Sequence, residues 1–126
     1  MTQKFTHILI FCLTTVFVQA QTITSYTTAD GLINNSANCV ITDADDNVWF
    51  GTQGGISKFD GTTWTNMDQS THPELVDNVI KAIFIDSDNG LWAGTDFGIS
   101  HFDGSTWTTY TTDDGLLDNR VFYINQ

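Results

Sequence analysis

The connection between residues 67 and 78 holds the side chains that come closest to a catalytic or metal-binding set. Asp68, His72 and Glu74 lie within a span of seven residues, and such groups can bind a metal or transfer protons. The sequence shows no nucleophile–base arrangement around them, so a solvated loop explains these residues better. We expect no catalytic residue, no metal and no cofactor, and we do not expect an enzyme.

A second candidate is the acidic run Asp86-Ser87-Asp88-Asn89-Gly90, which has the acid spacing that opens a calcium-binding loop. The EF-hand pattern has glycine at the sixth position and glutamate at the twelfth, whereas Gly90 is fifth and Phe97 is twelfth here. Short carboxylates also bond nearby backbone amides in turns. Turn formation is the better interpretation of this run.

Four tryptophans could stack on sugar rings. Trp49 and Trp92 hold identical strand positions in the two repeats, and each is followed two residues later by a glycine. Such a glycine leaves space for a large ring on an adjacent strand, so we expect Trp49 and Trp92 to pack between sheets. Trp64 and Trp107 fall on predicted outer strands, where packing and a surface role both remain open.

These tryptophans belong to a phrase that occurs twice, 43 residues apart. Residues 55–65 and 98–108 are identical at nine of 11 positions, and residues 43–67 and 86–110 at 14 of 25. A period of about 40–45 residues is typical of one four-stranded blade of a β-propeller. The sequence therefore predicts an all-β fold of repeated antiparallel meanders.

Turn signals divide each repeat into four short strands rich in threonine and aromatic residues. In a first blade over residues 38–67, we expect strands at 38–42, 48–52, 55–60 and 63–67. In a second blade over residues 80–110, we expect strands at 80–85, 91–95, 98–103 and 106–110. Asp60-Gly61 and Asp103-Gly104 predict type I′ hairpin turns, in which both central residues have positive φ.

The flanking segments look like parts of neighbouring blades. Residues 22–26 resemble the outer strand of a preceding blade, and residues 120–125 resemble the first strand of a following one. The predicted strands carry apolar residues on both faces, so two blades can cover each other on one face only. Because propellers close with about four to eight blades, residues 21–126 are expected to form an incomplete β-propeller. Its partners would be the remaining blades, or other copies through self-association.

Charge narrows the range of partners. The chain has 15 acidic residues against four Lys and Arg, and its formal net charge is −11. Such a surface repels phosphate backbones, so we expect no nucleic acid partner. Cys39 falls on a predicted strand, where a small buried side chain is the better interpretation than a reactive thiol.

Residues 1–20 have the pattern of a secretory signal peptide. Lys4 precedes an apolar run over residues 8–18, and Val18-Gln19-Ala20 offers a small-residue cleavage site. We therefore expect residues 21–126 to be periplasmic or extracellular. An uncleaved N-terminal anchor is the alternative, although the run is shorter than the roughly 20 apolar residues of a membrane span.

Residues 43–64 and 86–107 both carry the pattern Asp-x-x-x-x-[Val/Leu]-Trp-x-Gly-Thr-x-x-Gly-Ile-Ser-x-Phe-Asp-Gly-x-x-Trp, which resembles the two-component regulator propeller repeat. Residues 30–35 and 114–119 resemble the linker that opens such a repeat. The resemblance implies a periplasmic or extracellular input propeller, which in this family commonly precedes a membrane helix and a histidine kinase. Kinase chemistry and membrane attachment would then lie in segments absent from this chain, and the resemblance implies no catalytic residue.

The function favoured by these patterns is a ligand-sensing or ligand-binding propeller that forms the N-terminal part of a two-component-type sensor. A ligand would lie near the central axis, in contact with the linkers at 30–35, 73–78 and 114–119. These loops are rich in Asp and Asn, which suits hydroxylated extracellular ligands such as glycans. A secreted surface or adhesion scaffold is the first alternative. A propeller lyase is the second, and it would need a clustered acid–base set or a metal.

Overall fold

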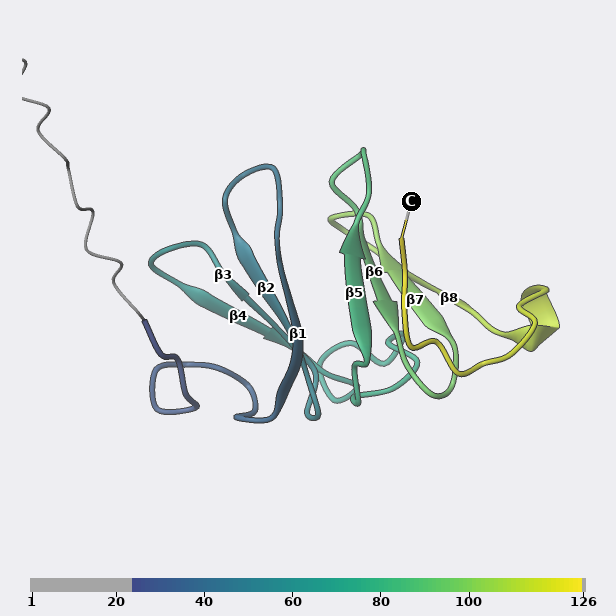
Figure 1. The fold of residues 1–126 in the computed structure, drawn as a ribbon, viewed down its shortest axis with the longest axis horizontal. Helices are drawn as coiled ribbons and strands as arrows, with labels where there is room; N and C mark the ends of the chain where they lie inside the picture. Colours follow the sequence, from purple (N-terminus) through teal and green to yellow (C-terminus); the bar gives the residue numbers. More distant parts are fainter. Residues whose placement is uncertain (1–23, 126) are drawn as a thin grey trace, which may run out of the picture.

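The computed structural model describes residues 24–125 and contains two antiparallel four-stranded sheets (Figure 1). The first sheet, blade 1, has the strand order β1-β2-β3-β4, and the second sheet, blade 2, has the order β5-β6-β7-β8. Every strand pairs with the next one along the chain, so both sheets are simple meanders. The predicted all-β fold of incomplete propeller blades is confirmed.

The strands are short and lie close to their predicted positions. Blade 1 consists of β1 (Ala37–Thr42), β2 (Val48–Thr52), β3 (Ile56–Phe59) and β4 (Trp64–Met67). Blade 2 consists of β5 (Ala82–Ile85), β6 (Leu91–Gly94), β7 (Ile99–Phe102) and β8 (Trp107–Tyr110). A single 3-10 turn, η1 (Thr112–Asp114), follows β8. Nothing helical within residues 24–125 has the length and apolar character needed to cross a membrane.

The flanking segments differ from their predicted form. Residues 24–26 and 120–125 adopt no regular strand structure. A strand is held by a ladder of hydrogen bonds to a neighbouring strand, and neither segment has such a neighbour among the described residues. Residues 120–125 still approach blade 2, because the Val121 N–H donates to the Thr95 carbonyl at 2.7 Å. The predicted signal peptide at 1–20 and residues 22–23 of the predicted outer strand lie outside the described residues.

The hairpins at Asp60 and Asp103 are present, but the prediction of type I′ turns is wrong. Only the glycines have positive φ, which is 93° at Gly61 and 101° at Gly104. The aspartate acts through its side chain instead. Asp60 Oδ1 accepts the backbone N–H groups of Thr62 and Thr63 at 2.9 and 2.7 Å, and Asp103 repeats this arrangement. Each turn is therefore held by a carboxylate that caps two amides.

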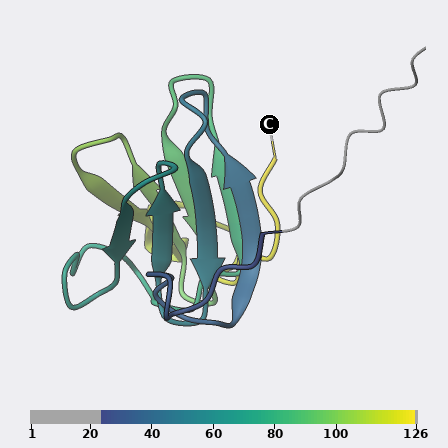
Figure 2. The ribbon, with the colours of Figure 1, turned by 90° about the vertical axis from the view of Figure 1, so that its left-hand side faces the viewer.

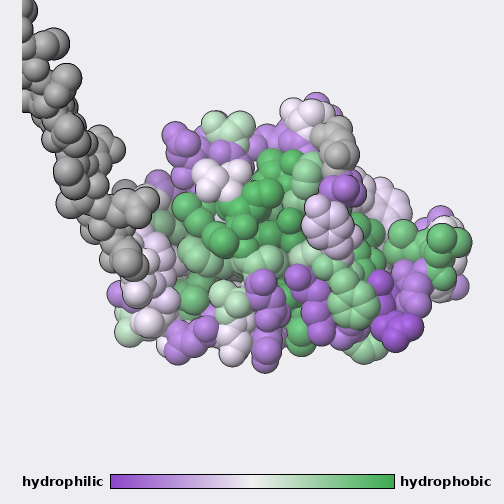
Figure 3. Space-filling model, viewed as in Figure 1, coloured by the Kyte–Doolittle hydropathy of each residue, from purple (hydrophilic) through white to green (hydrophobic). Residues whose placement is uncertain are grey.

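The hydrophobic core lies between the two blades. One face of blade 1 meets one face of blade 2, and we call this interface the seam. Its buried side chains are Trp49, Ile56, Met67, Leu75, Ile80, Leu91, Ala93 and Trp107. Hydrophobic surface also extends over the middle of the molecule in the view of Figure 3, whereas hydrophilic residues gather along the lower edge, where the linkers run.

The other face of each blade has no sheet against it among residues 24–125. Figure 2 looks at this open face of blade 1, on which Phe50, Phe59 and Trp64 form an aromatic cluster with Tyr26. On the open face of blade 2, Trp92 stacks with His101 and Tyr110. The two blades thus cover each other on one face only, as their sequence pattern predicted.

Candidate functional site

Three linkers carry the residues that were predicted to meet a ligand, and all three fold alike. We name them linker 1 (residues 27–36), linker 2 (68–79) and linker 3 (111–120). In each linker, an asparagine side-chain oxygen accepts a backbone N–H from near the start of the linker at 2.7 Å; these asparagines are Asn35, Asn78 and Asn119. The oxygen holds the linker closed, and the amide nitrogen of each asparagine is left to donate elsewhere.

Linkers 1 and 2 also attach to the blade that follows them. In linker 1, the Ile33 N–H donates to Ser57 Oγ at 2.9 Å, and Asn66 Nδ2 donates to the Gly31 carbonyl at 3.0 Å. Linker 2 repeats both contacts, from Val76 N–H to Ser100 Oγ at 3.0 Å and from Thr109 Oγ1 to the Glu74 carbonyl at 2.6 Å. A serine on the third strand and a polar residue on the fourth therefore form the receptor for each linker.

The glycines that follow Trp49 and Trp92 have a role other than the predicted one. A Cβ at Gly51 would meet Cys39 Sγ and would lie 2.7 Å from Ile80 Cγ2. A Cβ at Gly94 would lie 2.7 Å from Val121 Cγ1. The glycines thus make room for the chain that enters the next blade, and not for the tryptophan ring, so the sequence-based explanation is wrong.

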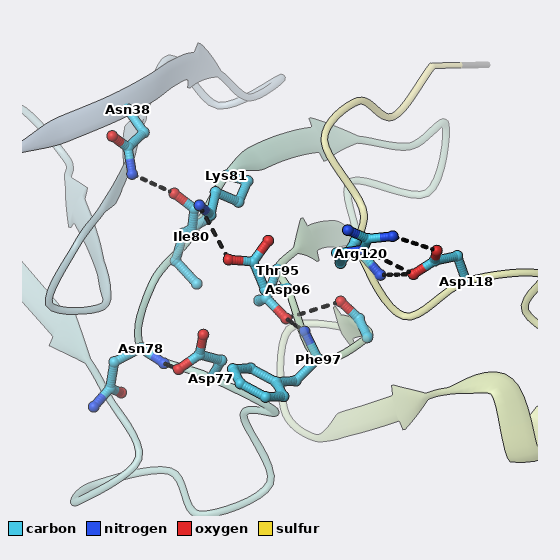
Figure 4. Close-up of polar contacts among 11 residues, drawn as sticks. Asn38, Asp77, Asn78, Ile80, Lys81, Thr95, Asp96, Phe97, Asp118 and Arg120 are labelled. Carbon is cyan, nitrogen blue, oxygen red and sulfur yellow. Dashed lines mark hydrogen bonds and ion pairs between the residues drawn. The ribbon is translucent and has the colours of Figure 1, made fainter.

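Charged residues surround the points where linkers 2 and 3 lead into the next segment (Figure 4). Lys81 Nζ lies 3.1 Å from Asp96 Oδ2, and Arg120 Nη2 lies 3.1 Å from Asp118 Oδ2. Hydrogen bonding to Asp118 raises the pKa of Arg120, and the charge of Asp96 adds to this effect. Two of the chain's four basic residues therefore lie at this end of the blades.

An exposed aromatic ring stands at the same end. Phe97, in the turn between β6 and β7, is 62% exposed. We call Asp77, Lys81, Asp96, Phe97, Asp118 and Arg120 the entry cluster. The sequence pattern leaves Phe97 between two predicted strands and indicates no role for it. The comparison of the two repeats could have drawn attention to Phe97. The equivalent residue of the first repeat is Gly54, so a large aromatic residue replaces glycine at this turn position.

In the loop of Asp68, His72 and Glu74, for which we expected a solvated loop and no metal site, Asp68 and His72 have local partners. Asp68 Oδ1 accepts from the Ser70 hydroxyl at 2.6 Å, and this bond and the Thr71 amide hold the pKa of Asp68 below its usual value. His72 Nδ1 lies 3.0 Å from Thr71 Oγ1. Within residues 24–125, no three His, Cys, Asp or Glu side chains gather as a metal site would require.

Two hollows lie along the seam. One, of about 420 Å³, opens between the blades and is lined by Asp45, Lys58, Asn89 and Phe102 among others. The other, of about 400 Å³, lies between residues 71–74 and 105–107. Trp107 lines it, and its indole N–H is buried without a hydrogen-bond partner among the described residues.

The repeated tryptophans of the second strands are fixed by aspartates six residues earlier. Trp49 Nε1 donates to Asp43 Oδ2 at 2.7 Å, and Trp92 Nε1 donates to Asp86 Oδ2 at 2.8 Å. Burial raises the pKa of Asp43, but hydrogen bonds from Trp49 and Asn47 outweigh it and hold the pKa below its usual value. The bond from Trp92 likewise lowers the pKa of Asp86. These acidic runs are thus turns that orient tryptophan.

The two meander sheets, joined through a common seam with open faces at both ends, define part of a β-propeller. A sequence model of the family described as "Two component regulator propeller" matches residues 31–54 and 74–97. Each match begins in a linker and ends in the turn after the second strand of a blade. Both repeats of this chain therefore match the two component regulator propeller family. No curated protein matches the chain.

Proposed function

We propose that this chain is the ligand-binding, non-enzymatic part of an extracytoplasmic two-component-type sensor. The entry cluster would bind a hydroxylated ligand such as a glycan. Phe97 is the observation that carries this proposal, because an aromatic side chain 62% exposed in a short turn offers an apolar face to a sugar ring. The neighbouring Lys81–Asp96 pair offers both a donor and an acceptor for hydroxyl groups.

Extracytoplasmic location is supported by the signal-peptide pattern of residues 1–20. It is tested by expressing the chain with its own N-terminus and measuring the mass of the product. Cleavage after Ala20 and recovery outside the cytoplasm are expected. Full-length protein in the cytoplasm would contradict the proposed location.

Ligand binding is tested by isothermal titration calorimetry with a panel of neutral and acidic oligosaccharides. We expect heat of binding with at least one member, and a loss of at least tenfold in affinity for Phe97→Ala. Thr62→Ala is the matched control, because Thr62 lies in an exposed turn on β3–β4 and its side chain makes none of the contacts described above. No heat with any oligosaccharide would reject the ligand class, and equal affinity of Phe97→Ala would reject the site.

A further inference from the structure

The open face of blade 2 repeats the chemistry of the seam. Trp92, Ile99 and Tyr110 hold the repeat positions of Trp49, Ile56 and Met67, which are buried in the core. Trp49 is 5% exposed and Met67 is 3% exposed, whereas Trp92 and Tyr110 are only half-buried. The open face therefore has the composition of an interface between blades.

Linker 3 has the folded form of a linker that is attached to a blade. Its closing hydrogen bond to Asn119 is as short as those of linkers 1 and 2. Thr111 and Asp114 form a reciprocal capping box around η1, and Gly115 has a φ of 110°, close to the 121° of Gly31 in linker 1. The conformation of linker 3 is set by its own residues before any blade covers it.

The attachment groups of linker 3 are nevertheless unused. Leu117 is fully exposed, at 104%, whereas its counterparts Ile33 and Val76 are half-buried. Among residues 24–125, no hydrogen bond joins the Leu117 N–H or the Gly115 carbonyl to another residue. The counterpart groups in linkers 1 and 2 bind the serine and the polar residue of a following blade. The partner of linker 3 must therefore offer the same pair of groups, a serine on a third strand and a polar residue on a fourth.

We propose that linker 3 and the open face of blade 2 bind blade 1 of a second copy of this chain. Blade 1 carries the required receptor, Ser57 with Asn66, beside its own open aromatic face. Linker 1 occupies that receptor within each copy, so linker 3 of one copy displaces linker 1 of the other. Residues 26–32 and 110–116 both read Tyr-Thr-Thr-x-Asp-Gly-Leu, so the two linkers compete for one position.

The packing of Tyr26 on the open face of blade 1 supplies the template for this contact. Tyr26 packs against Phe59 and Trp64 with ring centroids 5.3 Å from each. Tyr110 is the counterpart of Tyr26 in the phrase that opens linker 3, so it takes this place when linker 3 binds. The contact then covers apolar side chains of both open faces, which is the driving force for association.

Charge limits the strength of the contact. Across the existing seam, Asn89 Oδ1 accepts the Ala44 N–H and Asn89 Nδ2 donates to Asp45 Oδ2, both at 3.1 Å. In a contact between copies, Asp46 holds the position of Asn89 and Asp88 holds that of Asp45. Two carboxylates then face each other and repel. Association is therefore expected to be weak at neutral pH and to increase when either charge is removed.

Sedimentation velocity of the purified chain over a range of concentrations tests the proposal. The wild type is expected to shift from monomer to larger species as concentration rises. Leu117→Asp should remain monomeric, and its unchanged circular dichroism and melting temperature would show that the fold is intact, because Leu117 has no buried contact to lose. Asp46→Asn should associate at severalfold lower concentration. Asp46 and Asn89 have φ values of 64° and 65°, so this substitution keeps the turn.

Asn35→Ala and Asn119→Ala form a matched pair that tests linker exchange. Asn35→Ala loosens the competing linker 1 and should increase association, whereas Asn119→Ala loosens linker 3 and should decrease it. Opposite shifts support the proposal. Equal shifts, a wild type that is monomeric at every concentration, or association that survives Leu117→Asp would overturn it. The last result would assign the contact to another surface, such as the exposed Val40 and Phe122.

Discussion

Trp49 and Trp92 hold the same position in two repeats, yet their surroundings differ. Both donate to an aspartate six residues earlier, at 2.7 and 2.8 Å. Trp49 is closed within the seam at 5% exposure, with Lys58 Nζ 5.1 Å from its ring centroid. Trp92 lies on the open face of blade 2 and stacks on His101 at 4.1 Å. The repeat fixes the hydrogen bond, and the neighbouring blade decides the burial.

The outer-strand tryptophans show the reverse distribution. Trp107 of blade 2 is 9% exposed in the seam, whereas Trp64 of blade 1 is half-buried on the open face. Both rings stack on the phenylalanine of the preceding strand, with centroids 4.7 Å apart for Phe59–Trp64 and 4.9 Å apart for Phe102–Trp107. Trp107 is therefore a packing residue of the seam, and Trp64 packs in the aromatic cluster of the open face.

The largest difference between the two repeats is expected when the second-strand tryptophans are truncated. Trp49→Ala should destabilise the chain by about 3–5 kcal/mol, because it leaves a cavity in the seam. Trp92→Ala should cost about half as much, since its ring is already partly solvated. Chemical denaturation of both variants measures this. Equal losses of stability would mean that the open face of blade 2 is covered in solution. Repeating both truncations in the association-deficient Leu117→Asp variant tests this explanation. If the losses stay equal there, the assignment of Trp49 to a more buried position is wrong.

The aspartates that hold these tryptophans should give the next largest effect. Asp43→Asn should cost about 1–3 kcal/mol at neutral pH, because the new amide places a donor against the Trp49 or Asn47 donors. Asp86→Asn should cost less, since Asp86 is more exposed than Asp43. Denaturant unfolding of the pair provides the measurement, and a larger loss for Asp86→Asn would contradict the ranking.

The same carboxyls predict a loss of stability in acid. The folded chain holds the pKa of Asp43 and of Asp86 below the ordinary value. Their contribution is therefore complete above the unfolded pKa of about 3.9 and declines as pH falls towards the folded value. Thermal melting between neutral pH and about pH 3 should show this decline, with a shallower slope in Asp43→Asn. An unchanged slope in that variant would remove Asp43 from the explanation.

A Cβ at Gly51 probes the entry of the chain into blade 2. Gly51→Ala should cost about 1–3 kcal/mol, because the added carbon meets Cys39 and Ile80. Gly94→Ala crowds only Val121 in a segment without regular structure, so residues 120–125 can move aside at lower cost. Denaturation of both variants tests the difference, and a greater loss for Gly94→Ala would show that residues 120–125 are held as firmly as Ile80.

The smallest expected effects lie in the hairpin turns, where the two blades are equivalent. Gly104→Val should cost about 1–2 kcal/mol through backbone strain alone, since its φ is 101° and nothing lies within 4 Å of the new Cβ. Gly61→Val should cost the same. A clear difference between them would mean that a turn contacts something outside the described residues.

The strands and the seam were predictable to different degrees. Turn signals and the enrichment in threonine and aromatic residues placed all eight strands within two residues of their observed bounds. Type I′ turns were predicted wrongly, because the pairing of Asp with Gly does not reveal whether Asp acts by its φ or by its carboxylate. Phe97, which we propose as a ligand contact, was not singled out from the sequence because it lies in a turn, where packing between repeats sets no requirement.

The sequence alone determined the repeat and the meander, since both depend on residues that lie within one blade. Tertiary structure decided which tryptophan is buried, why Gly51 must be small, and how each linker attaches to the following blade. Those contacts join Asn38 to Ile80, or Gly31 to Asn66, across 35 or more residues. Contacts at such separation follow from the stacking of one sheet on another. The distance and angle between two sheets cannot be predicted from a local sequence pattern.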